Sequence, residues 1–248
     1  EKINMAKFYL DRNLEMNRGD KIAVYCKDKT YSYAQIVSFS NKVGNSLKTL
    51  GVEVEDRVLM VINDSAEFVA SWYGIIKIGA VATDVYSYLR AKDYEYFLNY
   101  TRAKVVIVDA DALPRMESVL GNSKYLKHVV VIGGSGTDYL SFEKMVEVAS
   151  NDLEIEQTHA DDVALWKFTS GSTGQPKGVQ LTHRNSLFNY HTYGRHVLGL
   201  EPDDIVLTVP KMFFGYARDI AMVYGFGSGS SAVLFPERTR AEGIFDYI

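Results

Sequence analysis

Short runs of consecutive apolar residues set the strongest limit on the fold of this chain. They lie at 58–62, 105–108, 129–132 and 163–166. A run that is apolar at every position suits a strand buried on both faces, as in a parallel sheet covered by helices. Between the runs, apolar residues recur at spacings of three and four, as they do from Ile36 to Leu50, which is typical of helices. The alternation predicts an α/β fold with doubly wound sheets of βα units.

A polar and acidic stretch at 151–162 indicates a division of the chain. We therefore expect a first αβ subdomain over residues 1–160 and the start of a second over residues 161–248. The second is expected to hold strands at 179–181, 205–209 and 232–235 and a helix over 183–198.

The start of one helix can also be predicted. Asp64 precedes a helical pattern in which Phe68, Trp72 and Ile75 share one face. An acidic residue followed three positions later by Glu67 matches a capping box, so we expect Asp64 to cap this helix.

Composition and charge argue against several classes of protein. The net charge is −4, so the chain lacks the basic footprint of a general nucleic-acid binder. The single cysteine, Cys26, lies in an apparent strand, where a buried and unreactive thiol is expected, and it suits a reducing compartment. The longest apolar stretch, at 68–83, contains Lys77 and is too short for a membrane span. With no signal peptide and no metal-binding histidine spacing, we expect a cytoplasmic protein without a membrane span, nucleic acid or protein-bound metal.

Ten consecutive residues at 169–178, Thr-Ser-Gly-Ser-Thr-Gly-Gln-Pro-Lys-Gly, indicate a chemistry. Glycines let a backbone turn sharply and approach a ligand, and successive N–H groups of a turn bind anions. The hydroxyls add donors, and Lys177 adds a positive charge that suits phosphate. The segment joins two expected strands and places a proline before its lysine, whereas a P-loop joins a strand to a helix. The sequence therefore predicts a polyphosphate loop that is not a P-loop.

The segment resembles the phosphate-binding signature of the adenylate-forming enzymes, which include acyl- and aryl-CoA synthetases, luciferases and the adenylation domains of peptide synthetases. Their pattern, Thr-Ser-Gly-Ser/Thr-Thr-Gly-x-Pro-Lys-Gly, is matched at every position. The resemblance implies that Lys177 is catalytic and stabilises charge on the leaving pyrophosphate. It also implies that ATP phosphates are bound by Thr169, Ser170, Gly171, Ser172, Thr173, Gly174 and Lys177.

A second segment, at 209–217, gathers aromatic residues directly after an expected strand. In open α/β sheets, ligands bind beyond the carboxyl ends of strands. The form Pro-Lys-x-Phe-Phe-Gly-Tyr-Ala, with Val-Leu-Phe-Pro-Glu-Arg at 233–238, resembles benzoate-CoA ligases and their aryl-CoA relatives. The resemblance implies an aromatic acid bound by Phe213, Phe214, Tyr216 and Ala217, with Phe213 in the gating position. Ordinary core packing of the aromatic residues is the alternative.

Arg218 and Asp219 depart from those relatives, which continue with small residues. A charge pair turned outward into solvent is the simpler expectation. If Arg218 points inward, it could instead recognise a substrate with a second anionic group.

The resemblance covers the whole chain but only about the first half of the family's enzymes, so we expect a truncated piece that is inactive alone and lacks the C-terminal lid domain. For the intact enzyme it implies that an aromatic carboxylate, benzoate or a close analogue, reacts with Mg·ATP to give acyl-AMP and pyrophosphate. Coenzyme A (CoA) then gives the thioester and AMP, as in the degradation of aromatic acids. Two alternatives remain open, namely delivery to a carrier protein and a non-catalytic binding module.

Overall fold

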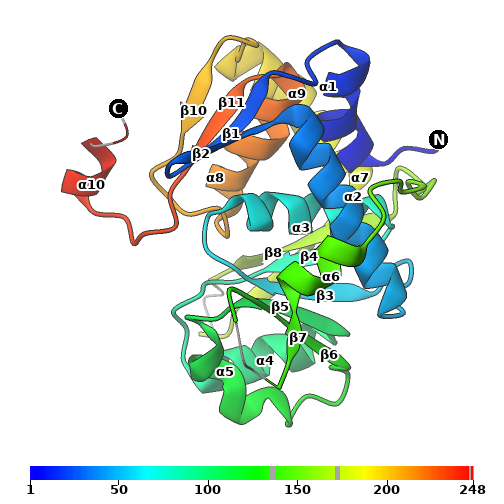
Figure 1. Ribbon diagram of the computed structural model, residues 1–248, viewed down its shortest axis with the longest axis vertical. Coiled ribbons are helices and arrows are strands. Elements are labelled where there is room, and N and C mark those ends of the chain that lie inside the picture. The colour runs from blue at the N-terminus through cyan, green and yellow to red at the C-terminus, as the bar shows by residue number, and fades with distance from the viewer. Residues whose placement is uncertain (135–137, 171–173, 246, 248) are drawn as a thin grey trace.

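The structure, a computed structural model, describes residues 1–134, 138–170, 174–245 and 247. It contains two sheets with helices packed between and around them (Figure 1). The larger sheet has seven strands in the order β7-β6-β5-β3-β4-β8-β9, and the smaller has four in the order β10-β11-β1-β2. The predicted α/β class with doubly wound, parallel-rich sheets is confirmed.

The strands are β1 (Ile22–Cys26), β2 (Lys29–Ser32), β3 (Arg57–Val61), β4 (Val81–Asp84), β5 (Val105–Asp109), β6 (His128–Ile132), β7 (Leu140–Ser141), β8 (Val163–Thr169), β9 (Lys177–Thr182), β10 (Ile205–Leu207) and β11 (Ser231–Leu234). The α-helices are α1 (Arg12–Glu15), α2 (Tyr33–Thr49), α3 (Ala66–Lys77), α4 (Ala91–Thr101), α5 (Leu113–Leu120), α6 (Phe142–Val148), α7 (His183–Asn189), α8 (Gly215–Arg218), α9 (Phe226–Ser228) and α10 (Ala241–Phe245). The π-helical segments are η1 (Lys7–Asp11), η2 (Tyr190–Leu198) and η3 (Asp219–Gly225).

The central strands of the larger sheet are buried on both faces, as their consecutive apolar residues predict. Met60 and Ile107 belong to a core cluster that includes α2 and α3. Their neighbours along the strands, Leu59 and Val106, belong to a second cluster with α4 and α5. Successive strand residues point to opposite faces, so each face needs its own apolar set.

The two sheets are each assembled from distant parts of the chain. In the smaller sheet β1 pairs in parallel with β11, so Val24 lies opposite Ala232. In the larger sheet β8 pairs in parallel with β4 and carries β9 as an antiparallel edge strand. Strands from both sides of residue 160 therefore share each sheet. The two subdomains expected at 1–160 and 161–248 stay a prediction, but their boundary does not separate the sheets.

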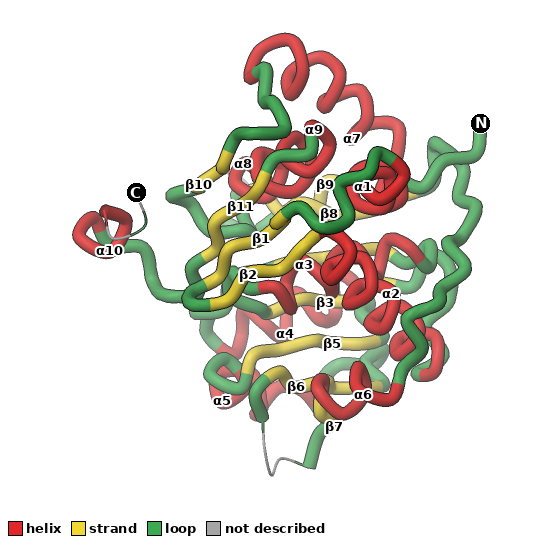
Figure 2. The backbone as a smooth tube through the Cα atoms, turned by 45° about the horizontal axis from the view of Figure 1, so that its top comes forward, coloured by secondary structure: helices red, strands yellow, loops and turns green. Residues whose placement is uncertain are grey.

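Helix α3 lies between the two sheets (Figures 1 and 2). Every residue of α3 except Glu67 is buried, and the Tyr73 hydroxyl donates a 2.8 Å hydrogen bond to the Met222 carbonyl of η3. The helix is capped by Ser65, whose side chain accepts from the Phe68 N–H. The predicted cap, Asp64, is wrong, because its carboxylate instead accepts from the Met212 N–H at 2.9 Å.

The helix expected over 183–198 is present as α7 followed by η2. Thr182 caps it by accepting from the Asn185 N–H, as its residue type predicts. His183 is buried, and its Nδ1 accepts from the Met5 N–H at 3.1 Å. Cys26 is half-buried rather than fully buried, and burial raises the pKa of its thiol, which disfavours the reactive thiolate. Across the described residues, no helix has both the length and the apolar character needed to cross a membrane.

Candidate active site

A cavity of about 760 Å³ opens where strands of both sheets end. Its walls come from segments 62–64, 84–89, 167–170, 209–215 and 236–239. These follow the carboxyl ends of β3, β4, β8, β10 and β11, respectively, or begin within their last residues. Open α/β sheets bind ligands in the crevice beyond the carboxyl ends of their strands, between the loops that follow those strands. The cavity is thus in the position that the fold favours for a site.

The two ends of the predicted phosphate loop flank this cavity. Thr169, Ser170 and Pro176 contribute to its walls. Thr169 pairs with Lys177 across the antiparallel β8–β9 ladder, so the loop joins two strands, as predicted. Gly171, Ser172 and Thr173 lie outside the described residues.

The second half of the loop is anchored by helix α4. The Tyr96 hydroxyl donates a 2.6 Å hydrogen bond to the Pro176 carbonyl. The Tyr100 hydroxyl accepts from the Gly178 N–H at 3.2 Å, and the two tyrosine rings stack on each other. Gly174 has a φ of +88°, a conformation that other residues rarely adopt. The tyrosines were not predicted from the sequence, because two positions four apart on a helix do not reveal what they contact.

Lys177 is exposed at the start of β9 and stands outside the cavity walls. A flexible four-carbon side chain on an exposed strand can reach towards a phosphate bound by the loop. Its catalytic role stays a prediction.

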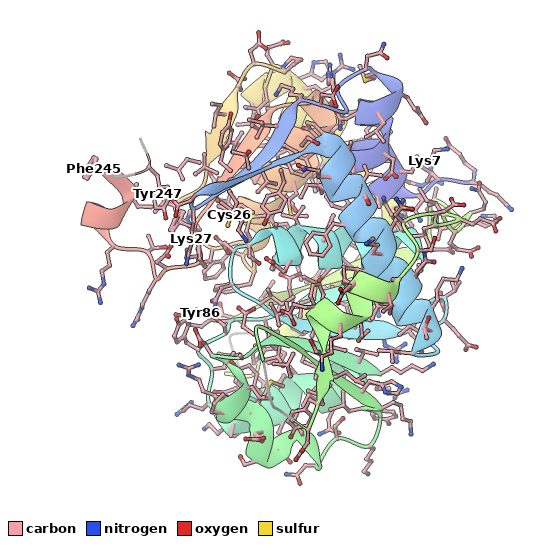
Figure 3. The ribbon with its side chains drawn as sticks, viewed as in Figure 1. Lys7, Cys26, Lys27, Tyr86, Phe245 and Tyr247 are labelled. Atoms are coloured by element: carbon pink, nitrogen blue, oxygen red, sulfur yellow. The ribbon has the colours of Figure 1, made fainter. Side chains whose placement is uncertain are left out.

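The aromatic segment reaches the cavity through two of its four predicted residues. Phe213 and Phe214 line it, and the Phe213 ring stacks on Tyr86 with the centroids 4.8 Å apart. Tyr86 follows β4 and lies on the same side of the molecule as α10 (Figure 3). Helix α8 begins at Gly215 and turns the next two residues away: Tyr216 is 65% exposed, Ala217 is fully buried, and neither lines this cavity. Their role in binding an acid stays a prediction.

Two carboxylates near the cavity have environments that favour their neutral form. Burial raises the pKa of Asp64 to about 6, although Lys211 lies 3.7 Å away and opposes the shift. Burial likewise raises the pKa of Asp109 to about 6, while the backbone and side-chain N–H groups of Asn63 donate to it at 2.7 and 2.9 Å. Asn63 lines the cavity and accepts in turn from the Ser87 hydroxyl at 2.6 Å.

A cluster of four charged side chains lies beside the cavity, and two of its residues contribute to the cavity walls. Arg218 donates from Nη1 to Asp84 Oδ1, and its Nε lies 3.8 Å from Asp219 Oδ1. Lys167 donates to the other oxygen of Asp219. The Arg218 guanidinium also lies 5.5 Å from the centre of the Trp72 ring, a cation–π contact. We call these four residues, Asp84, Lys167, Arg218 and Asp219, the buried charge cluster.

The expectation that Arg218 turns outward into solvent is therefore wrong. Its side chain is fully buried: Nη1 pairs with Asp84 and the guanidinium lies against the Trp72 ring, while no hydrogen-bond acceptor among the described residues reaches Nε or Nη2. The alternative was that an inward-pointing Arg218 recognises a second anionic group of the substrate. It has no direct support either, since Arg218 does not line the cavity. The cluster members that do line it are Asp84 and Lys167. Lys167 passes so close to Gly215 that a Cβ there would lie 2.8 Å from its Cδ.

Within the parts of the chain that the structure describes, no three His, Cys, Asp or Glu side chains gather to hold a metal ion.

Residues 10–248 match the AMP-binding enzyme family. The chain belongs to that family.

Among AMP-binding enzymes, the chain is similar to benzoate-CoA ligase of Thauera aromatica, with 34% identity over 248 residues. It is 32% identical over 243 residues to the 4-hydroxybenzoate-CoA/benzoate-CoA ligase of Rhodopseudomonas palustris. These alignments cover 99% and 98% of this chain but 46% and 45% of the relatives. The chain thus spans about half the length of the curated relatives that it matches.

Two solved AMP-binding enzymes share its architecture. An anthranilate-CoA ligase in complex with anthranoyl-AMP superposes with a TM-score of 0.94 and 36% identity, over 98% of this chain and 47% of that one. A benzoate-CoA ligase from Burkholderia xenovorans gives a TM-score of 0.89 and 26% identity, over 99% and 48%.

The sequence did not lead us to expect the charged residues that line the cavity. Asp84 ends an apolar strand, and Lys167 interrupts another. Asp84 directly follows the apolar stretch 68–83, and Lys167 directly follows the apolar run 163–166. A charge that is buried there needs a partner, and this position was the available signal.

Proposed function

We propose that this chain supplies the ATP- and acid-binding half of an AMP-forming ligase that converts benzoate or a close analogue to its CoA thioester. One observation carries the proposal: the ends of the phosphate loop and the aromatic pair Phe213–Phe214 line a single cavity at the strand ends. An aromatic acid whose ring packs on Phe213 and Phe214 would thus lie beside a nucleotide held by the loop. That proximity is the main requirement for joining the two.

The reaction has two steps. In the first, a carboxylate oxygen of the acid bonds to the α-phosphorus of ATP, and the bond from that phosphorus to the β-phosphate bridging oxygen breaks. Acyl-AMP forms and pyrophosphate leaves. In the second, the CoA thiolate attacks the acyl carbonyl carbon, the bond to the AMP oxygen breaks, and AMP leaves. Mg²⁺ enters with ATP as part of the substrate.

The chain's residues serve the first step. The hydroxyls of Thr169 and Ser170 donate to phosphate oxygens, and Lys177 offsets negative charge that develops on the leaving pyrophosphate. Phe213 and Tyr86 hold the aromatic ring by stacking, which favours a flat acid over an aliphatic chain. The rest of the intact enzyme completes the site, so the chain alone is expected to be inactive.

Removal of Lys177 tests the proposal in the intact protein that carries this chain. In a Lys177→Ala variant, benzoate-dependent exchange of pyrophosphate into ATP is expected to fall about 100-fold or more, the usual effect of losing one preorganised charge. Lys29 is a matched control, because it is also an exposed lysine on an edge strand but belongs to the other sheet, away from the phosphate loop. Lys29→Ala is expected to exchange normally. Equal rates in both variants would remove Lys177 from the mechanism.

A product assay tests the acceptor. With free CoA, the intact protein is expected to form an aryl-CoA thioester that chromatography detects. Exchange activity without thioester would instead favour delivery to a carrier protein. Absence of exchange with aromatic and aliphatic acids alike would favour a non-catalytic binding role.

A further inference from the structure

Asp64 connects the two sheets across one wall of the cavity. It follows β3 of the larger sheet, whereas the loop at 209–215 follows β10 of the smaller sheet. Asp64 Oδ1 accepts a 2.9 Å hydrogen bond from the Met212 N–H, and Asp64 Oδ2 lies 3.7 Å from Lys211 Nζ. One carboxylate thus holds two consecutive residues of a loop that belongs to the other sheet.

These contacts are closed to solvent, so they fix the loop firmly. The Asp64 side chain is only 3% exposed, and Met212 is fully buried. Water cannot replace the hydrogen bond there, and a buried N–H that loses its acceptor destabilises the structure. Lys211 attaches the loop a second time, because its ammonium donates to the Phe235 carbonyl and lies 3.5 Å from the centre of the Phe235 ring. The loop is therefore held from the ends of both β3 and β11.

The part of the loop that is held directly precedes the aromatic residues of the cavity. Phe213 follows Met212, lines the cavity and stacks on Tyr86. The Phe214 N–H donates to the Lys211 carbonyl at 2.9 Å, which closes a turn around Phe213. A shift of the Met212 backbone therefore moves the Phe213 ring as well. A gap of about 0.5–1 Å between ring and ligand already loses a quarter to a half of their van der Waals attraction.

Asp64 itself contributes to the cavity walls, but its charge argues against a direct contact with the reacting groups. A carboxylate repels the carboxylate of an acid and the phosphates of ATP, and this repulsion is weakly screened away from water. Both oxygens of Asp64 already face the loop, through Met212 and Lys211. Its effect on a bound acid would therefore pass through the position of the loop.

We propose that Asp64 is a positioning residue for the aromatic acid: by holding Met212 and Lys211, it fixes the Phe213 ring where a flat acid packs against it. The proposal rests on the proposed function, because it concerns a wall of the same pocket. A wall that is held in place before the acid arrives loses less conformational freedom on binding. Asp64 would therefore act on the affinity for the acid and on the preference for flat rings, but not on the affinity for ATP.

Two substitutions of similar volume test this role in the intact protein. Asp64→Val removes the acceptor, whereas Asp64→Asn keeps an oxygen for the Met212 N–H. In pyrophosphate exchange, Asp64→Val is expected to raise KM for benzoate about tenfold or more, while kcat and KM for ATP change by less than about threefold. Its ratio of kcat/KM for benzoate to that for cyclohexanecarboxylate, a non-planar acid of similar size, is expected to fall. Asp64→Asn should restore most of both values.

Asp56 provides a matched control at the other end of β3. Its carboxylate also combines a backbone N–H and a lysine: it accepts from the Glu53 N–H at 2.9 Å and lies 2.7 Å from Lys104 Nζ. It does not line the cavity. Asp56→Val is expected to keep the wild-type KM for benzoate and the wild-type ratio between the two acids, even if it lowers the melting temperature.

Several results would overturn the positioning role. They are an unchanged KM for benzoate in Asp64→Val, an equal rise in KM for ATP, the same changes in Asp56→Val, and an Asp64→Asn variant no better than Asp64→Val. If Asp64→Val does not fold, Asp64→Glu replaces it, because it moves the carboxylate by one methylene. A raised KM for benzoate in Asp64→Glu supports the role, and an unchanged one overturns it. Absence of exchange in the wild type would overturn the proposed function, and the positioning role with it.

Discussion

Removing one partner of the Arg218–Asp84 ion pair in the buried charge cluster should destabilise the protein strongly. Arg218→Leu removes the cation that pairs with Asp84, whose side chain is only 2% exposed. Because this side chain is closed to solvent, water cannot take over the lost interaction. Losing one partner of a buried ion pair typically costs about 3–5 kcal/mol of the free energy of unfolding. For a chain of this size that lowers the melting temperature by roughly 6–20 °C.

The same reasoning predicts how a second substitution and pH change this loss. Adding Asp84→Val should recover most of it, because an apolar pair of similar volume is often neutral or stabilising. Burial already raises the pKa of Asp84 to about 6, and loss of Arg218 raises it further. The cost of Arg218→Leu should therefore be largest at alkaline pH and shrink as pH falls towards 6, because the carboxyl of the variant becomes neutral at its raised pKa.

Urea unfolding of the wild type, Arg218→Leu and the double variant at pH 5 and 8 measures these effects. Equal stability of the single and double variants at pH 8 would refute the reasoning. So would a cost of Arg218→Leu that is the same at both pH values.

Two further predictions concern stability. Ser65→Ala removes the side-chain cap of α3 and should cost about 1 kcal/mol in urea unfolding, and an unchanged midpoint would mean that the cap contributes nothing. Burial lowers the pKa of His183 to about 4 from an ordinary value near 6.5, so folding loses stability as pH falls from 6.5 towards 4. His183→Asn should reduce the free energy of unfolding that is lost at acid pH by up to about 3 kcal/mol, which unfolding curves at pH 7 and 4.5 would show. A variant with the same acid sensitivity as the wild type would exclude His183 as its source.

The fold was predictable where the signal is local. Each apolar run became a strand because a strand buried on both faces needs apolar residues at consecutive positions. Pairing between β1 and β11 was not predictable, since nothing near Val24 indicates that its neighbour is Ala232. The cap of α3 was missed for a similar reason: Asp64 fits the local pattern, but Met212 and Lys211, distant in sequence, take its carboxylate.

The candidate site was predictable in part. The segments around Thr169 and Phe213 stand out by composition, and they do converge on one cavity. Arg218 was placed outward because a charged residue is usually solvated, and its partner Asp84 lies 134 positions away. A buried ion pair is a property of the tertiary structure, so neither residue reveals the other in a linear sequence.

The pairing of β1 with β11 has a consequence for synthesis of the protein on the ribosome. The hairpin of β1 and β2 emerges early, but the strand that completes its sheet begins only at Ser231. At the usual 5–20 residues per second, the edge of β1 stays unpaired for roughly 10–40 s. Such an edge can pair with another nascent chain, so protection by a chaperone or slow release from the ribosome would matter most during this interval.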